Sequence, residues 1–465
     1  MSGIFGVVSK GDCSNALFLG TDYHSHLGIQ YGGLAVHSEK KIIKRIHNIS
    51  RSQFKSKFFG DIEEMKGNAG IGVISDKYAQ PLIFQSKLGL FAICTNGLIE
   101  NEDELISELI GEGAFFNELA NGTTNATELV AKLVCQGDSI VDGIDHMFKK
   151  IEGSISLLLL NKDGVYAARD RHGHTPLVIG EGKDSWAVAS ESCSFPNLGL
   201  KTKKFIGPGE IVLLNENGFR SVKGDGELNR ICAFLWIYTG FPTSSYEGIN
   251  TELVRENCGR ALARNDDVEA DLVAGVPDSG IAHAIGYAME SGLPYRRPLV
   301  KYTPGYGRSY TPPSQEIRDQ IAFMKLIPSV DVINGNKIIL CEDSIVRGTQ
   351  LKNFTLKKLF NSGAKEVHVR PACPPLMFPC KFNISTRTKE ELVARRAIKA
   401  IEGKDIKDVS EYLNPDSEKY KKMVEWIRKD IGATSLKYQH LDDMIKAIGL
   451  PKEKLCLYCW TGECY

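Results

Sequence analysis

The residues best suited to chemistry gather in one stretch of the sequence, NKIILCEDSIVRGTQLKNF, at residues 336–354. An apolar run at residues 338–341 is typical of a buried strand, and two carboxylates, Glu342 and Asp343, follow it directly. A loop of small and hydroxyl residues at 344–349 then leads into a predicted helix, and the N–H groups of such a loop can surround a phosphate. The carboxylates suit ribose hydroxyls and a hydrated Mg²⁺. The stretch therefore predicts a site for a phosphorylated sugar, rather than a plain strand-to-helix turn with a surface acidic pair.

A second candidate group is formed by cysteines. The sequence contains twelve of them, and Cys456 and Cys459 form a C-x-x-C pair in the segment CLYC. In a reducing compartment this number does not indicate a disulfide framework, so a paired spacing indicates metal or redox chemistry first. A single pair does not choose between zinc and redox use.

Length and composition exclude several classes of protein. With 465 residues, 42% of them hydrophobic and 25% charged, the chain is long enough for two or three globular domains and is neither disordered nor collagenous. The formal net charge of zero argues against bulk attraction to nucleic acid or anionic lipid, but a small phosphorylated ligand remains open. No apolar run reaches the roughly 18 residues of a membrane span, and the N-terminus does not resemble a secretory signal. We therefore expect a cytoplasmic protein with no nucleic-acid or membrane partner.

The elements that must position these residues change character near residue 225. Before it, short β-branched and aromatic runs broken by glycine, such as GIFGVV and LGLFAICTNG, are typical of a strand-rich sandwich with few helices. One of those helices is expected to start near Thr127. After residue 225, apolar runs alternate with helical segments, which predicts a parallel sheet with its ligand site at the carboxyl ends of the strands.

A charged segment between about Lys389 and Leu436 is expected to form helices docked on the surface. Asn414 is a good N-cap with Pro415 in the first helical position, and Gly432 is a typical helix end. The helix between them carries an apolar stripe at Met423, Val424, Ile427 and Ile431.

The string at residues 342–349 closely resembles the 5-phosphoribosyl-1-pyrophosphate (PRPP) signature of the phosphoribosyltransferases, and S-I-V-R-G-T narrows the resemblance to the glutamine PRPP amidotransferase family. The resemblance covers nearly the whole chain. It implies a fold of the α/β and α+β classes, with an N-terminal Ntn-hydrolase-type α/β/β/α sandwich and a C-terminal type I phosphoribosyltransferase domain built on a parallel sheet. The implied divisions are a glutaminase-like domain at 1–227, a phosphoribosyltransferase domain at 228–388, and a helical insert with the C-terminal tail at 389–465.

Two further motifs carry the resemblance at the phosphoribosyl site. GVPDSG resembles the family's pyrophosphate loop, and KYTPGYGRSYTPPSQEIRDQ resembles its flexible lid. The resemblance implies that PRPP is bound by Pro277, Asp278, Ser279, Gly280, Ser344, Ile345, Val346, Arg347, Gly348 and Thr349. It implies catalytic roles for Lys301 and Arg308 in the lid and for Glu342 and Asp343, which would also hold Mg²⁺. Taken singly, the alternative for Lys301 or Arg308 is an ordinary solvated cation.

The N-terminal half keeps the family's scaffold motifs, RDRHGHTPL, ASESC and IGPGE, but departs from the family at the reactive positions. Ser2 stands where the family's cysteine attacks glutamine, Ser75 where an arginine binds the α-carboxylate, and Ala126 where an aspartate binds the α-amine. Only the oxyanion pair, Asn96 and Gly97, remains. Because a zwitterion needs both charges in its pocket, we expect a degenerate, inactive glutaminase. The alternatives are a serine hydrolase that acts on another amide and an error in the alignment.

The junction between the halves also departs from the family. CAFLWIYTGFPTS has Leu235, Phe241 and Thr243 in place of a glutamate, an arginine and an aspartate, which puts in doubt the channel that carries ammonia between the halves. The cysteines, in contrast, match all four positions that hold a [4Fe–4S] cluster in many family members, and a structural role is implied. These positions are Cys232, Cys380, Cys456 and Cys459.

Three functions remain open from the sequence. The first is a PRPP-dependent transferase that forms 5-phosphoribosylamine, in purine biosynthesis, from free ammonia or from ammonia supplied by an amidotransferase partner. The second is a catalytically silent protein that binds PRPP or purine nucleotides and regulates or scaffolds an active partner. The third is a phosphoribosyltransferase with a different amine acceptor. The resemblance also implies a homo-oligomer, either a dimer or a tetramer.

Overall fold

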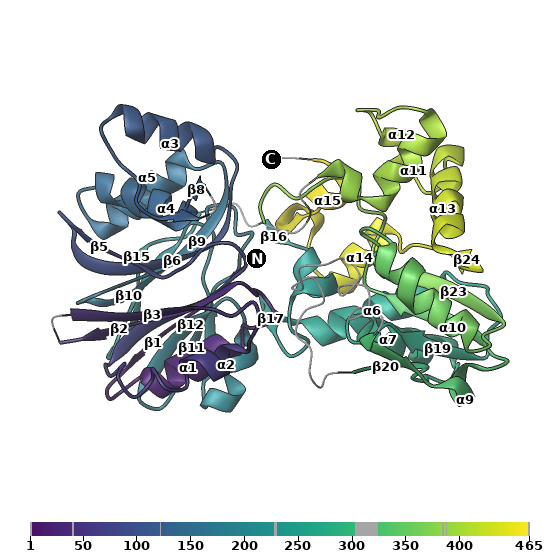
Figure 1. The fold of residues 1–465 in the computed structure, drawn as a ribbon, viewed down its shortest axis with the longest axis horizontal. Helices are drawn as coiled ribbons and strands as arrows, with labels where there is room; N and C mark the ends of the chain where they lie inside the picture. Colours follow the sequence, from purple (N-terminus) through teal and green to yellow (C-terminus); the bar gives the residue numbers. More distant parts are fainter. Residues whose placement is uncertain are drawn as a thin grey trace.

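The computed structural model describes residues 2–39, 41–120, 122–226, 230–302, 324–383, 386 and 388–463. They form two halves, which meet near residue 230 (Figure 1). The chain begins between the halves, so that the first residues of β1 lie on the side of the N-terminal half that faces the C-terminal half. Among the described residues, none of the helices has the length and apolar character needed to cross a lipid bilayer.

The N-terminal half is a sandwich of two antiparallel sheets. The seven-stranded sheet has the order β13-β11-β12-β1-β4-β2-β3, and the six-stranded sheet has the order β15-β14-β10-β9-β6-β5. The strands of the first sheet are β1 (Gly3–Ser9), β2 (Tyr31–Ser38), β3 (Lys41–Asn48), β4 (Ala69–Ser75), β11 (Val178–Glu181), β12 (Ser185–Ala189) and β13 (Lys201–Phe205). Those of the second are β5 (Leu82–Ser86), β6 (Gly89–Ile99), β9 (Gly153–Asn161), β10 (Gly164–Ala168), β14 (Ile211–Asn215) and β15 (Gly218–Lys223).

Helices cover both outer faces of this sandwich. Two lie on the first sheet, α1 (Ser14–Asp22) and α2 (Phe54–Phe58), and three lie on the second, α3 (Glu102–Gly111), α4 (Ala126–Gln136) and α5 (Ile140–Lys150) (Figure 1). The expected helix near Thr127 is α4, which is capped by the Asn125 side chain. Apolar side chains fill the space between the sheets and between each sheet and its helices. The predicted α/β/β/α sandwich is confirmed.

The C-terminal half contains a parallel sheet of four strands in the order β19-β22-β23-β24. Its strands are β19 (Leu272–Gly275), β22 (Lys337–Glu342), β23 (Glu366–Pro371) and β24 (Ser435–Leu436), and β20 (Leu299–Lys301) pairs with β21 (Leu326–Pro328) beside it. Helices flank the sheet: α6 (Thr251–Arg264), α7 (Ile281–Ser291), the π-helical turn η4 (Leu351–Leu356), α10 (Lys357–Asn361) and α14 (Leu441–Ile448). The predicted parallel sheet is confirmed.

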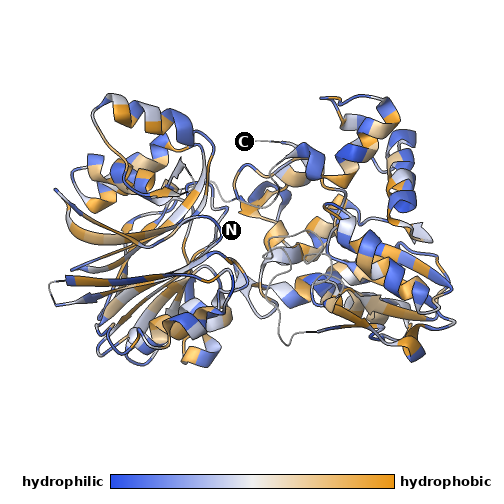
Figure 2. Ribbon diagram, in the orientation of Figure 1, coloured by the Kyte–Doolittle hydropathy of each residue, from blue (hydrophilic) through white to orange (hydrophobic). Residues whose placement is uncertain are grey.

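The charged segment forms helices α11 (Val393–Glu402), α12 (Ser410–Leu413) and α13 (Glu418–Ile431), which stand on one side of the C-terminal half (Figure 1). The predicted start of α13 is wrong by one turn. Ser417 is the N-cap and accepts a hydrogen bond from the Tyr420 N–H, whereas Asn414 caps the preceding turn by accepting one from the Asp416 N–H. The predicted end at Gly432 is confirmed. Figure 2 shows the alternation of hydrophilic and hydrophobic residues along α13 that leaves one face of it buried.

Candidate active site

Two loops leave the same edge of the parallel sheet and form the first candidate site. Gly275 ends β19 opposite Cys341 of β22, so the loop at 276–280 and the carboxylates that end β22 lie side by side. The Ser279 hydroxyl donates a hydrogen bond of 3.1 Å to Glu342 Oε1. A β-carbon at Gly280 would lie 2.4 Å from the carbonyl oxygen of Cys341, so only glycine allows this approach. The structure therefore brings the predicted pyrophosphate loop and the predicted acidic pair together.

The two carboxylates differ in their surroundings. Burial raises the pKa of Glu342 well above its usual value, and the charge of Asp343 raises it further. Asp343 is itself buried and accepts a hydrogen bond of 2.6 Å from the Ser344 hydroxyl. Like charges this close cannot both ionise freely, so the pair is suited to a cation that would neutralise them.

Lys301, a residue of the predicted lid, ends β20, and its side chain reaches the predicted pyrophosphate loop. Its Nζ atom lies 2.5 Å from Asp278 Oδ2, and the two side chains are 44% and 63% exposed. Because both groups are open to solvent, a ligand can replace this ion pair at small cost. Arg308, the other predicted lid cation, lies outside the described residues.

The other residues of the predicted phosphate-binding loop at 344–349 lie in different surroundings. Ile345 is buried in the apolar core, and Val346 packs partly against the cluster around β22. Arg347 forms an ion pair of 2.9 Å with Glu391, which directs its side chain towards the helical segment. Gly348 has a φ of +74°, a value that favours glycine, and the helix follows from Thr349.

The second candidate site lies at the N-terminus, where the chain ends of β1 and β4 meet β6. The Ser2 N–H donates a hydrogen bond of 3.0 Å to Asn96 Oδ1, and Ser2 Oγ lies 3.5 Å from Ser75 Oγ. Gly97 follows Asn96 in β6, with a φ of +142°. Ala126 is the first residue of α4. Direct contacts thus bring Ser2, Ser75 and Asn96 together.

A buried polar network, which the sequence did not reveal, occupies the region behind Ser75. Ser75 Oγ accepts hydrogen bonds from the Tyr78 N–H at 3.2 Å and from Gln80 Nε2 at 3.4 Å. Gln80 Oε1 accepts from the Thr95 N–H at 2.8 Å and from Thr127 Oγ1 at 3.1 Å. These partners are 15 and 47 residues apart from Gln80 in the sequence, so residue types gave no signal for them. The Ser75 hydroxyl oxygen therefore already accepts hydrogen bonds from other groups of the protein.

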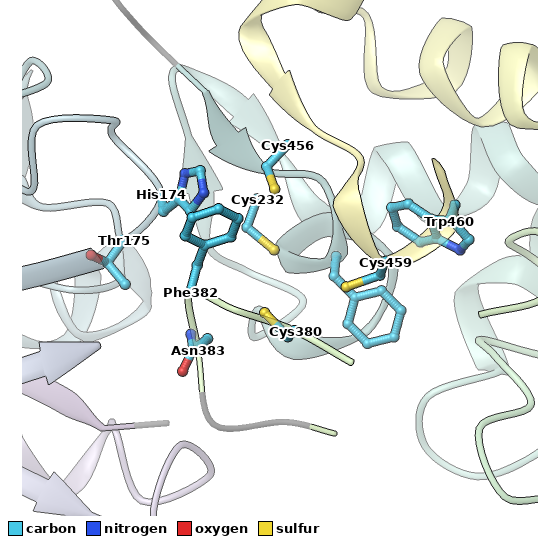
Figure 3. Close-up of a pocket in the computed structure, with 10 residues that line it drawn as sticks. His174, Thr175, Cys232, Cys380, Phe382, Asn383, Cys456, Cys459 and Trp460 are labelled. Carbon is cyan, nitrogen blue, oxygen red and sulfur yellow. The ribbon is translucent and has the colours of Figure 1, made fainter. Parts of the chain in front are cut away.

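Four cysteines line one pocket where the two halves meet (Figure 3). Cys232 lies in the short strand β16 (Ile231–Cys232), which pairs in parallel with β25 (Leu455–Cys456). Cys380 and Cys459 complete the set, and His174 and Phe382 lie beside it with their rings 3.9 Å apart.

The thiols influence one another. A hydrogen bond with Cys459 lowers the pKa of Cys380 to about 7, whereas burial, and then Cys456 and Cys380, raise the pKa of Cys232. In the part of the chain that the structure describes, no three Cys, His, Asp or Glu side chains are placed as ligands of a single metal ion. The four thiols instead surround a shared space, and thiolates are the donors that hold iron–sulfur clusters. The set fits such a cluster.

Comparison with known proteins decides the family. The chain is 32% identical to the amidophosphoribosyltransferase of Bacillus subtilis, over 99% of this chain and 93% of that protein. It is also 32% identical to the amidophosphoribosyltransferase of Methanocaldococcus jannaschii, over 100% of this chain and 97% of that protein. The chain belongs to the amidophosphoribosyltransferase family.

Solved structures and a family model agree with this assignment. The B. subtilis glutamine phosphoribosylpyrophosphate amidotransferase, solved in complex with ADP and GMP, superposes with a TM-score of 0.85 at 31% identity, over 99% of this chain and 96% of that one. A model described as a glutamine amidotransferase domain matches residues 69–197. The resemblance, the two-part amidophosphoribosyltransferase fold and the prediction of an enzyme of this glycosyltransferase class are confirmed.

Proposed function

We propose that this protein is a PRPP-dependent phosphoribosyltransferase that forms 5-phosphoribosylamine from PRPP and ammonia rather than from glutamine. The observation that carries the proposal is a contrast between the two sites. Lys301 and Asp278 form an exposed ion pair beside the acidic pair, whereas the Ser75 hydroxyl accepts hydrogen bonds from the protein's own Tyr78 and Gln80. One site can exchange its internal bonds for those of a charged ligand. The other offers a neutral hydroxyl where a charged clamp for glutamine would be needed.

The phosphoribosyl site would bind PRPP through both loops. Backbone N–H groups of residues 278–279 and 344–349 are suited to the phosphates, and Lys301 and Arg308 would supply positive charge over the pyrophosphate. Glu342 and Asp343 would hold Mg²⁺, which lowers the cost of the negative charge that develops on the leaving group. Closure of the lid residues would exclude water, which competes with the amine for C1 of the ribose.

The chemistry at C1 is a displacement. The bond between C1 and the pyrophosphate oxygen breaks, and the lone pair of ammonia forms the new C–N bond. Positive charge builds on the sugar while negative charge builds on the pyrophosphate, so fixed donors around the leaving group stabilise the transition state. A proton is then lost from the bound nitrogen to solvent.

At the N-terminal site, the two positions expected to clamp glutamine, Ser75 and Ala126, carry no charge. A free amino acid brings an α-carboxylate and an α-amine, and burial of either without a partner costs several kcal/mol. With Ser75 and Ala126 at the two clamp positions, and Ser2 in place of the cysteine nucleophile, we infer that the glutaminase reaction is lost. Ammonia would come from solution or from a partner protein.

The four-cysteine pocket would hold a [4Fe–4S] cluster with a structural role. Its cysteines come from the junction, from the segment after β23 and from the C-terminal tail, so a cluster there would fasten three parts of the chain. We place the domain divisions at 1–227, 228–388 and 389–465, and we infer a cytoplasmic homo-oligomer.

The test is identification of the product. Anaerobically purified protein is incubated with PRPP, Mg²⁺ and ¹⁵N-ammonium, and the phosphoribosyl product is analysed by mass spectrometry. We expect one ¹⁵N atom in 5-phosphoribosylamine. Binding of PRPP without any labelled product, with ammonium in large excess, would overturn the proposal and favour the regulatory function or another amine acceptor.

A further inference from the structure

A buried carboxylate, Glu191, connects the two halves of the molecule. Glu191 follows β12 in the N-terminal half and is 2% exposed. Its Oε1 atom accepts a hydrogen bond of 2.6 Å from the Tyr246 hydroxyl, and its Oε2 atom lies 2.9 Å from His26 Nε2. The Ser244 hydroxyl donates to the same Oε2 atom at 3.2 Å. One carboxylate therefore joins a loop of the N-terminal half to the first residues of the C-terminal half.

We define residues 235–246 as the junction segment. Its contact with Glu191 includes the backbone, because the Phe241 N–H donates to Oε2 at 3.3 Å. The next residue along, Ser192, accepts a bond of 2.9 Å from the Ser245 N–H, and the ring of His26 lies 5.2 Å from that of Phe241. The N-terminal half thus holds this segment at several points around one charge.

Glu191 holds this position as an ionised group. Burial alone would raise its pKa, but His26 and the Tyr246 hydroxyl lower the pKa of Glu191 to about 2. A buried charge requires partners to remain charged, and the loss of a partner is costly. The charge of Glu191 therefore depends on donors from the junction segment, and the position of that segment depends on the carboxylate.

The other side of the junction segment is held by Arg255, whose charge interacts with that of Asp343. Arg255 of α6 is buried, and its guanidinium donates to the carbonyl oxygens of Trp236 at 2.8 Å and Gly240 at 2.7 Å. Burial lowers the pKa of Arg255, and among the charged groups around it Asp343 opposes this most strongly. Arg255 thus lies within the field of one of the two carboxylates of the site.

Apolar packing makes the same connection. Trp236 and Ile237 of the junction segment belong to the same core cluster as Cys341 of β22. Val346 of the loop at 344–349 packs against this cluster. A shift of the segment would therefore move groups that border the acidic pair.

We propose that Glu191 is a positioning residue for the phosphoribosyl site, where it fixes the junction segment and, through it, the side of the site from which the amine approaches. The inference rests on the proposed function for the identity of the reaction. It concerns alignment of the acceptor more than the binding of PRPP. Misplacement of a reacting group by about 1 Å can lower a rate a hundredfold, so a small shift is sufficient.

The test compares Glu191→Gln with Glu210→Gln in the full-length protein. Glu210 is an equally buried carboxylate, 2% exposed, whose partners, the Gly207 N–H and Lys204, lie within the N-terminal half. We measure KM and kcat for ammonium, the Kd of PRPP, and hydrogen–deuterium exchange of residues 235–246. Tyr246→Phe, which removes one donor to Glu191, is a milder second variant should Glu191→Gln fold poorly.

We expect Glu191→Gln to raise KM for ammonium roughly tenfold, to leave the Kd of PRPP within about twofold, and to speed exchange in the junction segment. Tyr246→Phe is expected to act in the same direction more weakly, and Glu210→Gln to do none of these. Equal effects of Glu191→Gln and Glu210→Gln would overturn the inference. If the protein binds PRPP but does not use ammonium, the proposed function fails, whereas the exchange comparison still decides the role of Glu191.

Discussion

The two candidate sites differ in what their polar groups are bonded to. At the phosphoribosyl site, charged side chains face one another across loops: Lys301 pairs with Asp278 in the open, and Ser279 bonds the acidic pair. At the N-terminal site, neutral groups are bonded within a buried network around Ser75 and Gln80. We infer from the comparison that the fold is kept whole while one of its sites becomes neutral and internally bonded. Three of the predictions below, on Asp343, Lys301 and Ser2, separate the two sites by experiment.

The largest effect is expected from Asp343→Asn. It removes a carboxylate beside the leaving group, where metal and fixed charges contribute most to the rate, so pyrophosphate release should fall by roughly a hundredfold or more. Release with ammonium is measured at saturating PRPP. Asp331→Asn, at an exposed position before β22, is the control and should leave the rate unchanged. A fall of less than about threefold for Asp343→Asn would place the reaction elsewhere.

Cys456→Ser should abolish cluster assembly. Three thiolates do not complete the set of four that a [4Fe–4S] cluster takes, so bound iron and sulfide and the visible absorbance should be lost. Because the pocket joins the junction to the C-terminal tail, the midpoint of thermal unfolding should also fall. Cys373→Ser, at a buried cysteine outside the pocket, is the control for the absorbance. Full iron content in Cys456→Ser would contradict this assignment.

Lys301→Ala should weaken PRPP binding about tenfold, the size of one charge-assisted contact to a phosphate. The matched control is Lys337→Ala. Lys337 begins β22, at the end of the strand away from Glu342, and pairs with Glu366 at 2.9 Å. Isothermal titration calorimetry gives both dissociation constants. Equal constants for the two variants would mean that Lys301 is an ordinary surface cation.

The pH dependence of stability should reflect buried histidines in both halves. Burial lowers the pKa of His24 to about 4 and that of His283 to about 3, below the unfolded value near 6.5. The unfolded chain therefore binds more protons, and stability is lost as the pH falls from 6.5 through these values, by up to about 1.4 kcal/mol per pH unit and group. His283→Asn should reduce this slope in urea unfolding between pH 7 and pH 5. An unchanged slope would show that His283 takes up its proton without opening the structure.

The smallest effect is expected from Ser2→Ala. If the N-terminal site takes no part in the reaction with ammonium, the rate should stay within about twofold of the wild type. Ser2→Cys should likewise fail to create turnover with glutamine, since the clamp positions remain Ser75 and Ala126. A large loss of ammonium-dependent rate in Ser2→Ala would show that the N-terminal site takes part in the reaction with ammonium.

The sequence allowed prediction of what depends on neighbours along the chain. The apolar run before Glu342 and Asp343 became β22, the glycine at 432 ended α13, and the helix expected near Thr127 is α4. The error at Asn414 arose because Ser417, three residues on, is an equally good cap, and only the docking of α13 selects one of them.

What could not be predicted depends on contacts across the fold. Gln80 and Thr127 gave no local signal, and Glu191 meets Tyr246 from 55 residues away. These residues have ordinary types in ordinary local contexts, and only the packing of distant segments gives them partners. For Gln80 and Thr127 this packing lies within the N-terminal half, and for Glu191 it joins the two halves. The four cysteines were an exception. The spacing of Cys456 and Cys459 indicated metal or redox chemistry, and the family resemblance added Cys232 and Cys380 to them.

The central claim is tested most directly by pyrophosphate release from PRPP and Mg²⁺, measured with anaerobically purified protein and with ammonium chloride or glutamine in parallel. The account predicts release with ammonium and none above background with glutamine. Equal release with the two nitrogen donors would contradict it, because the site around Ser2, Ser75 and Ala126 would then still be a working glutaminase.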